Sequence, residues 1–157
     1  VASCKALQAH GAWERARTLG PRLAAAARAL DAALRGAKGA RGFARFRTLL
    51  HGDFKTANMF LREAAPGVDF EVAAVDFEFS GPGLVATDLA NFLFPDMRMD
   101  LLDEEPELLR VYHESLEACL GDLGLGCDFT LQLLEAHYAA ARCDYMRYML
   151  GRGWTAC

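Results

Sequence analysis

The chain has 157 residues, a length that suits one domain and is short for two. Hydrophobic residues make up 53% of it and charged residues 24%, which excludes a disordered or a fibrous protein. Apolar runs fall far short of the roughly 20 residues that span a bilayer, and the N-terminus lacks the apolar core of a signal peptide. We therefore expect no membrane partner. Because the chain does not begin with Met, we also expect it to be a piece of a longer protein.

The net charge of −4 combines two parts of opposite sign. Residues 1–50 carry ten Lys and Arg against two acidic residues, a net +8, whereas residues 51–157 carry a net −12. A basic segment is typical of nucleic-acid binding, but these charges are spread among Ala and Leu without interleaved aromatic residues. We favour a solvated helix face or an anion-facing surface, and expect no nucleic-acid partner.

The cysteines argue against covalent or metal cross-links. They are five in number, and no two have C-x-x-C spacing: Cys4, Cys119, Cys127, Cys143 and Cys157. An odd count without that spacing disfavours a disulfide framework and a zinc site built of cysteines. We expect reduced thiols in an intracellular, cytoplasmic protein.

Two helices are predicted at the start of the chain, over about 3–19 and over 21–36. Pro21 suits the first position of the second helix, and Gly36 suits its C-terminal stop. The apolar stripe of this helix consists of Leu23, Ala27, Leu30 and Leu34. A flexible basic link is predicted over 36–42.

A β segment follows. Residues 46–50 and 59–62 are predicted to be short strands, and 70–79, rich in Val and Phe, is the clearest strand of the chain. A turn centred on Pro66-Gly67 joins the last two into a hairpin. The glycines and proline of 81–83 are predicted to end it.

Three further helices are expected. The first, over 84–94, is predicted to be buried. The second follows the acidic run 100–107, is capped by Asp103 and stops at Gly121. Its apolar stripe consists of Leu109, Tyr112, Leu116 and Cys119. We interpret the acidic run as a solvated helix start rather than as an attractant for a cationic substrate.

The last helix is predicted over 129–150, capped by Asp128 and ended by Gly151. Its stripe consists of Leu131, Leu134, Tyr138, Ala141, Tyr145 and Tyr148, which we interpret as core rather than as the wall of a substrate pocket. The order of elements predicts an α+β, mostly helical domain with a small β insertion. An alternating doubly wound sheet is disfavoured.

Polar groups that can bind a metal lie beside the predicted strands, in His51-Gly-Asp-Phe-Lys-Thr-Ala-Asn58 and in Val75-Asp-Phe-Glu78. Pairing of the hairpin strands would bring Asn58 and Asp76 to one end of the hairpin, with Asp53 on the loop beside them. Two carboxylates and an amide oxygen suit Mg²⁺, which prefers oxygen ligands. A metal site next to a free carboxylate is the arrangement that phosphoryl transfer requires.

The segment HGDFKTAN resembles the catalytic loop of aminoglycoside phosphotransferases and choline kinases, relatives of protein kinases whose loop reads H-R-D-x-x-x-x-N. The spacing of five from Asp53 to Asn58 matches. The segment V-D-F-E, with Asp76 eighteen residues after Asn58, resembles the D-F-G strand end, and GPGLVATDLANFL resembles the group's stretch ending in D-L-A. The resemblance spans about 45–95 and is closest to the ecdysteroid-kinase-like branch.

The resemblance implies roles for particular residues. Asp53 would be the catalytic base, and Asn58 and Asp76 would bind the Mg²⁺ that bridges the phosphates of ATP. Lys55 would contact the transferring phosphate, with a solvated side chain as the alternative. Two further residues would support the loop, namely His51 beneath it and Asp88 as its anchor. Glu78 is interpreted as an exposed strand-end residue rather than a second metal contact.

The resemblance also implies a protein-kinase-like C-terminal lobe, with a catalytic segment at 46–95 and a helical, substrate-side subdomain at 104–150. Nothing before His51 resembles the phosphate-covering loop or strand lysine of an N-terminal lobe. We therefore expect 1–157 to be a single domain whose N-terminal lobe lies elsewhere in the parent chain.

The expected activity is that of an ATP-dependent phosphotransferase acting on a hydroxyl of a small metabolite whose identity the sequence does not indicate. The alternatives are a non-catalytic, kinase-like binding or scaffold module, and a fragment without independent function.

Overall fold

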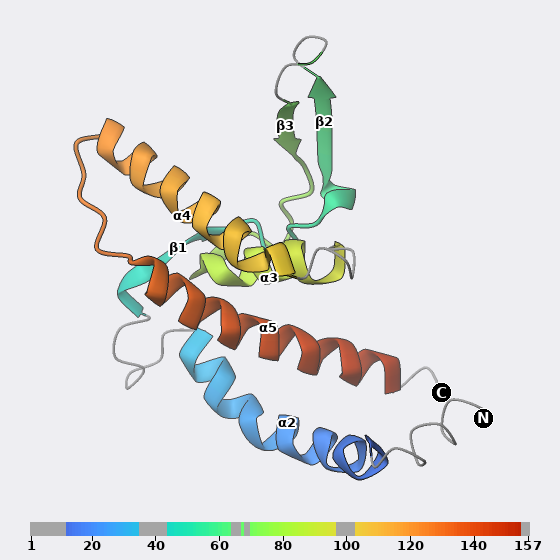
Figure 1. Ribbon diagram of the computed structural model, residues 1–157. Coiled ribbons are helices and arrows are strands. Elements are labelled where there is room, and N and C mark those ends of the chain that lie inside the picture. Colours follow the sequence, from blue (N-terminus) through green and yellow to red (C-terminus); the bar gives the residue numbers. More distant parts are fainter. Residues whose placement is uncertain (1–11, 35–43, 64–66, 68–69, 97–102, 155–157) are drawn as a thin grey trace.

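The computed structural model describes residues 12–34, 44–63, 67, 70–96 and 103–154 (Figure 1). The described helices are α2 (Ala12–Leu34), α3 (Val85–Asp96), α4 (Glu105–Asp122) and α5 (Leu131–Trp154), with single 3-10 turns at Ala44–Phe46 and Thr56–Asn58. The described strands are β1 (Arg47–Leu50), β2 (Met59–Glu63), β3 (Phe70–Ala74) and β4 (Gly81–Leu84), which form two antiparallel pairs, β1–β4 and β2–β3. The expected mostly helical α+β composition is confirmed.

Helix α5 occupies the centre of the helical part. Helix α2 packs on one side of it, and α3 and α4 pack on the other (Figure 1). The core lies where α3, α4 and α5 meet, and its buried residues are Ala86, Leu89, Ala90, Leu93, Leu109, Phe129, Leu134, Tyr138 and Ala141. Burial of a leucine side chain of this kind contributes about 1.5–3 kcal/mol. This junction of helices supports the β segment.

Two separate helices were predicted before residue 36, and this prediction is wrong. Helix α2 runs unbroken through Pro21. An interior proline removes one helical hydrogen bond and costs about 3 kcal/mol. Packing against α5 offsets this cost, since the predicted apolar stripe from Leu23 to Leu34 is half-buried, as expected. Residues 3–11, the predicted stop at Gly36 and the rest of the link 36–42 lie outside the described residues.

The β2–β3 hairpin is confirmed, with a register that runs from Met59 opposite Ala74 to Glu63 opposite Phe70. Of its predicted turn, only Gly67 is described. The strand predicted over 70–79 is too long, because it ends at Ala74 and Asp76 has a φ of +67°.

The segment 81–83 was predicted to end the hairpin, and this too is wrong. It belongs to β4, which pairs with β1 from Arg47 opposite Leu84 to Leu50 opposite Gly81. In a two-stranded sheet every strand is an edge, which is where a proline such as Pro82 is tolerated.

Helix boundaries and caps differ from the predictions at several points. Helix α4 begins at Glu105 after Glu104, so Asp103 lies one residue too far upstream to cap it. Helix α4 ends at Asp122, one residue past Gly121. The buried helix predicted over 84–94 is confirmed as α3, shifted by a residue or two.

The cap of α5 is Thr130, whose Oγ1 accepts a hydrogen bond from the Leu133 amide at 3.3 Å. Asp128, predicted to be the cap, instead pairs with Arg45 at 2.8 Å. The helix also continues through Gly151 to Trp154. The predicted cap is wrong because α5 begins at Leu131, which puts Asp128 two residues upstream of the cap position.

The two predicted stripes are correct except at their ends. Cys119 of α4 is exposed, and the buried position on that face is taken by His113. Tyr148 of α5 is half-exposed, because the contact with α3 at Phe94 is made one turn earlier by Tyr145. Among the described residues, no helix has both the length and the apolar character that a bilayer crossing demands.

Candidate active site

The loop between β1 and β2 begins with a sharp turn at Gly52. Its φ is +89°, and a Cβ placed there would lie 2.1 Å from the carbonyl oxygen of Phe79. Only glycine combines this left-handed backbone with such a close approach. The turn brings the loop against the segment that leads to β4. His51 and Asp53 lie on either side of Gly52.

Asp88, in the first turn of α3, holds this turn from below. Its two carboxylate oxygens accept hydrogen bonds from the backbone amides of His51 at 2.7 Å and Gly52 at 3.0 Å. The residue is only 9% exposed. Hydrogen bonds to a charged group contribute about 1.5–3 kcal/mol each, so the core helix α3 determines where the loop lies.

The buried His51 ring joins the loop to the end of the hairpin. Its Nε2 lies 2.9 Å from the Val75 carbonyl oxygen, and its Nδ1 lies 3.4 Å from the Asp53 amide nitrogen. With the proton on Nε2, the ring donates to Val75 and accepts from Asp53. The ring also packs against Phe77, with centroids 4.5 Å apart. His51 therefore lies beneath the loop and fixes its distance from the strand.

Asp53, Lys55 and Asn58 form one hydrogen-bonded group. The Oδ2 of Asp53 accepts from Lys55 Nζ at 2.6 Å and from Asn58 Nδ2 at 3.0 Å. The same Nδ2 donates to the Asp53 carbonyl oxygen at 2.9 Å. The side chains of Asp53 and Lys55 are 30% and 43% exposed, and Asn58 is buried. The Asp53 carboxylate is therefore partly exposed to solvent, whereas the Asn58 side chain that binds it is buried.

The Lys55 ammonium holds the pKa of the Asp53 carboxyl below its usual value. The Asn58 amide acts in the same direction, and partial desolvation opposes both. Asp53 is therefore a carboxylate at neutral pH. Lys55 and Asn58 both contact Oδ2, and no described hydrogen bond involves the second oxygen, Oδ1.

Asp76 and Asn58 lie at the same end of the hairpin. The Val75 amide donates to the Asn58 carbonyl oxygen at 3.0 Å, which continues the β2–β3 pairing by one bond and puts Asp76 directly beyond it. Asp76 is exposed, and its φ of +67° is uncommon for a residue with a side chain, although aspartate is among those that adopt it. Its carboxylate is not part of the hydrogen-bonded group around Asp53.

The donor set at this end of the hairpin fits a hard cation. The Nδ2 of Asn58 is committed to Asp53, which leaves its Oδ1 as a ligand, and Asp76 adds an exposed carboxylate. Amide and carboxylate oxygens are the ligands that Mg²⁺ takes from proteins. Glu78 is exposed, and no described contact ties it to this group.

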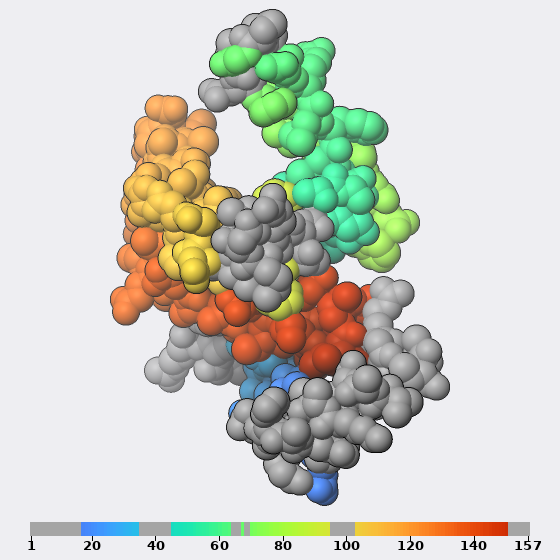
Figure 2. Space-filling view, turned by 45° about the vertical axis from the view of Figure 1, so that its right-hand side comes forward, coloured from blue at the N-terminus to red at the C-terminus, as the bar shows by residue number. Residues whose placement is uncertain are grey.

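A cavity of about 510 Å³ lies beside the loop. It is bounded by the base of the hairpin, by α3 and by α4, and Figure 2 shows the molecule hollowed between α4 and the hairpin. Its walls are mainly apolar and include Phe54, Phe77, Leu89, Phe92, Val111 and Tyr112. Volumes of roughly 300–1,000 Å³ are usual for small-molecule sites.

Several residues of the site were not anticipated from the sequence. The three phenylalanines of the cavity come from three separate segments, and no periodic pattern links them. Ser80 Oγ donates to the His51 carbonyl oxygen at 3.2 Å, a further tie across the turn. Gly52 could have been noticed, because a glycine between two functional positions often marks a left-handed turn.

The chain matches one protein family. The model of the ecdysteroid kinase-like family matches residues 8–125, so the chain belongs to this family. The match includes both motif segments and extends upstream of them into α2. This family stands among kinase-like phosphotransferases that act on small molecules. No curated protein and no solved structure matches the chain.

Proposed function

We propose that this chain is the catalytic lobe of a kinase that transfers the γ-phosphoryl group of ATP to a hydroxyl of a small metabolite. The observation that carries the proposal is the Asp53 carboxylate, which Lys55 and Asn58 keep ionised and oriented at the surface of a loop anchored by Asp88. Family membership supports the reaction class.

Asp53 accepts the hydrogen bond of the substrate hydroxyl and takes its proton as the oxygen attacks phosphorus. The geometry supports this role, because the loop is fixed at both ends: His51 and Gly52 are bound to Asp88, and Asn58 is bound to Val75. A base held in this way contributes about 10²–10⁴-fold to the rate.

Mg²⁺ would be held by Asn58 Oδ1 and the Asp76 carboxylate. The metal would supply positive charge to the phosphate oxygens of ATP, as phosphoryl transfer requires. Lys55 is half-exposed and lies within the same group, so its Nζ can leave Asp53 for the transferring phosphate. The positive φ of Asp76 supports a functional role, since uncommon backbone conformations concentrate at such sites.

The acceptor substrate would enter the cavity between the hairpin and α4. The cavity borders the His51 and Asp88 side of the catalytic loop, and α4 contributes Leu108, Val111 and Tyr112 to its wall. The helices after residue 104 are then the elements that select the substrate, as expected for the substrate-side subdomain.

A further lobe would complete the nucleotide site. The β2–β3 hairpin projects from the helical part (Figure 1) and exposes four large apolar side chains, Phe60, Leu61, Phe70 and Val72. Leu61, Phe70 and Val72 share one face of the hairpin, since Leu61 lies opposite Val72 and Glu63 lies opposite Phe70, and an exposed apolar face of this kind usually marks an interface. We assign it to contact with an N-terminal lobe supplied by the parent protein.

The test is Mg²⁺-dependent turnover of ATP by the parent protein with a panel of small hydroxyl compounds. Asp53→Asn should abolish turnover but leave nucleotide binding and the fold intact, whereas Asp122→Asn, at the exposed end of α4, should have no effect. Near-normal turnover in Asp53→Asn contradicts the proposal. A parent protein that binds no Mg²⁺–ATP would instead support the scaffold alternative.

A further inference from the structure

A second group of ligand-type side chains lies away from the catalytic loop, where α4 faces the segment that leads into α5. We propose that His113, Glu117 and Cys127 bind one Zn²⁺ ion that fastens α4 to this segment. The ligand atoms of the three residues all lie within 4.8 Å of one another. This proposal is independent of the proposed kinase function, since none of these residues belongs to the Asp53 loop or lines the cavity beside it.

The three residues form a mixed nitrogen, oxygen and sulfur set, which is the chemistry that zinc accepts. The Nδ1 of His113 lies 3.4 Å from the Oε2 of Glu117, one helical turn further along α4. In tetrahedral zinc sites the ligand atoms are separated by roughly 3.3–3.8 Å, so this pair already has the required spacing. Glu117 is half-exposed, and small rotations of its side chain and of Cys127 would complete the set.

The orientation of His113 is that of a metal ligand. Its Nε2 lies 2.6 Å from the carbonyl oxygen of Phe129, a group that can only accept, so Nε2 carries the proton. The Nδ1 lone pair then faces outward from a buried ring. A histidine that binds a metal through one nitrogen usually donates the other N–H to a carbonyl or carboxylate in this way.

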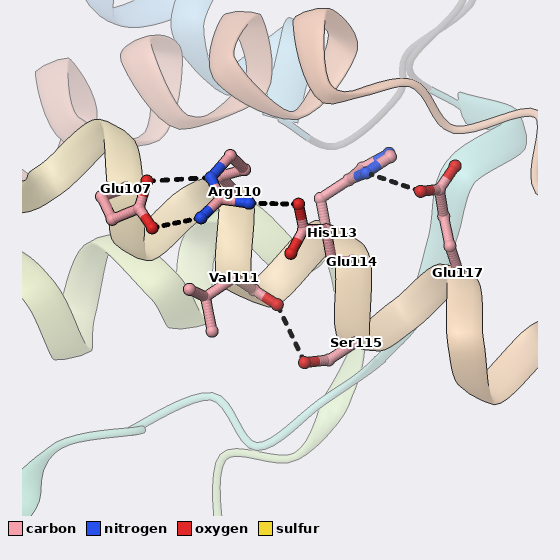
Figure 3. Close-up of polar contacts among 7 residues, drawn as sticks. All are labelled: Glu107, Arg110, Val111, His113, Glu114, Ser115 and Glu117. Atoms are coloured by element: carbon pink, nitrogen blue, oxygen red, sulfur yellow. Dashed lines mark hydrogen bonds and ion pairs between the residues drawn. The ribbon is translucent and has the colours of Figure 1, made fainter.

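The contact between His113 and Glu117 is one that a cation would stabilise. In the Nε2–H form of the ring, the Nδ1 lone pair and the carboxylate oxygen are both acceptors, and they repel each other unless a proton or a metal ion lies between them. Figure 3 shows the two side chains turned toward one another. Arg110, the nearby arginine of α4, is paired with Glu107 and Glu114.

Cys127 supplies the third ligand of the proposed site. Its Sγ lies 3.4 Å from the Phe129 carbonyl oxygen, the same atom that orients His113. A proton between His113 and Glu117 needs no thiol, whereas Zn²⁺ takes one readily as thiolate. Binding of Zn²⁺ would release the Cys127 proton to solvent. The fourth coordination position of the ion would be left for a water molecule, on the side of the exposed Glu117.

The site escaped detection in the sequence because its spacing is unusual. Only the helical pair His113 and Glu117 is local, and Cys127 reaches it after α4 has ended and the chain has turned at Gly124. No C-x-x-C or H-E-x-x-H pattern arises from this arrangement.

The test is Co²⁺ titration of the full chain, since Co²⁺ replaces Zn²⁺ and reports a thiolate ligand by a charge-transfer band. One equivalent should bind and give the band, and Cys127→Ser should remove it. Glu117→Gln should weaken binding about tenfold or more. The matched controls Cys119→Ser and Glu114→Gln, on the exposed surface of α4, should retain both the band and the affinity.

Zn²⁺ should also raise the midpoint of thermal unfolding of the wild-type chain but not that of Cys127→Ser, because a ligand that binds only the folded state stabilises it. Wild-type chain that gives no band overturns the proposal. A band that survives in Cys127→Ser also overturns it. Oxygen ligands at the catalytic loop cannot imitate the result, because they produce no thiolate band.

Discussion

Two buried carboxylates, Asp88 and Glu105, are each only 9% exposed, yet they are satisfied in different ways. Asp88 accepts two hydrogen bonds from the backbone amides of His51 and Gly52, in the loop between β1 and β2. Glu105, the first residue of α4, accepts from the Tyr138 hydroxyl at 2.6 Å and pairs with Arg142 of α5.

The partners decide what each carboxylate does. Backbone amides place a loop whatever side chains it carries, so Asp88 acts on the position of Asp53. Side-chain partners join two helices, so Glu105 acts on the packing of α4 against α5. Burial and the Glu105 carboxylate raise the pKa of the Tyr138 hydroxyl, which therefore remains a donor. The comparison predicts that loss of Asp88 impairs turnover, whereas loss of Glu105 lowers only the free energy of unfolding.

The largest effect, a loss of turnover, is expected on substitution of Asp53, whose position depends on Asp88. Asp53→Ala should lower kcat by about 10²–10⁴-fold, the usual contribution of a general base. Its free energy of unfolding should fall only slightly, because Asn58 Nδ2 keeps its hydrogen bond to the carbonyl oxygen of residue 53 and the ion pair with Lys55 is partly exposed. Steady-state kinetics and urea unfolding of the same preparation measure the two quantities. Loss of stability without loss of turnover would contradict the assignment of Asp53.

Asp88→Ala should reduce both kcat and the free energy of unfolding. It leaves the amides of His51 and Gly52 buried without an acceptor, at a cost of about 1–3 kcal/mol each. The loop should then move, and kcat should fall even in molecules that remain folded. Urea unfolding gives the first value, and kcat per folded molecule gives the second. Normal kcat in the folded fraction would mean that the anchor is structural only.

Glu105→Ala should lower the free energy of unfolding by about 1–3 kcal/mol, because Arg142 and the Tyr138 hydroxyl lose their partner. Turnover per folded molecule should remain unchanged. The matched control is Glu107→Ala two residues further along α4, whose ion pair with Arg110 is exposed and should contribute much less to the free energy of unfolding. Equal effects of the two substitutions would remove the distinction between Glu105 and a surface residue.

The smallest effect concerns pH. Because Lys55 keeps the pKa of Asp53 below its usual value of 3.8, the carboxylate stabilises the folded state at pH values above this, and that contribution is lost as the pH falls through the lowered pKa. Lys55→Met should raise the pKa of Asp53 toward its usual value, and Lys55→Arg should keep it low. Carboxyl titration of the unliganded protein by NMR measures the shift. An unchanged pKa in Lys55→Met would show that the ion pair does not form in solution.

The parts of the molecule that could be predicted are those formed by residues near one another in the chain. Asp53, Lys55 and Asn58 lie within one loop, and the hairpin joins neighbouring apolar runs. The helical stripes were also predictable over most of their length, since burial on one side of a helix imposes a 3.6-residue period.

Other features depended on partners that are distant in the sequence. Strand β4 has the sequence Gly-Pro-Gly-Leu, which shows no strand pattern, and it is a strand because β1 lies beside it. Asp128 lies two residues too early to cap α5 and pairs with Arg45 instead, and α2 continues through Pro21 because its half-buried stripe from Leu23 onward packs against α5.

The sequence by itself determined the family and the mostly helical composition, and it supplied the candidate site residues, because short spacings and helical periods are local properties of a chain. Only the tertiary structure decided which carboxylate is held by backbone and which by side chains, where the cavity lies, and that Cys127 meets His113 and Glu117. These arrangements depend on how the elements pack, and packing energies are summed over contacts between residues that no local pattern connects.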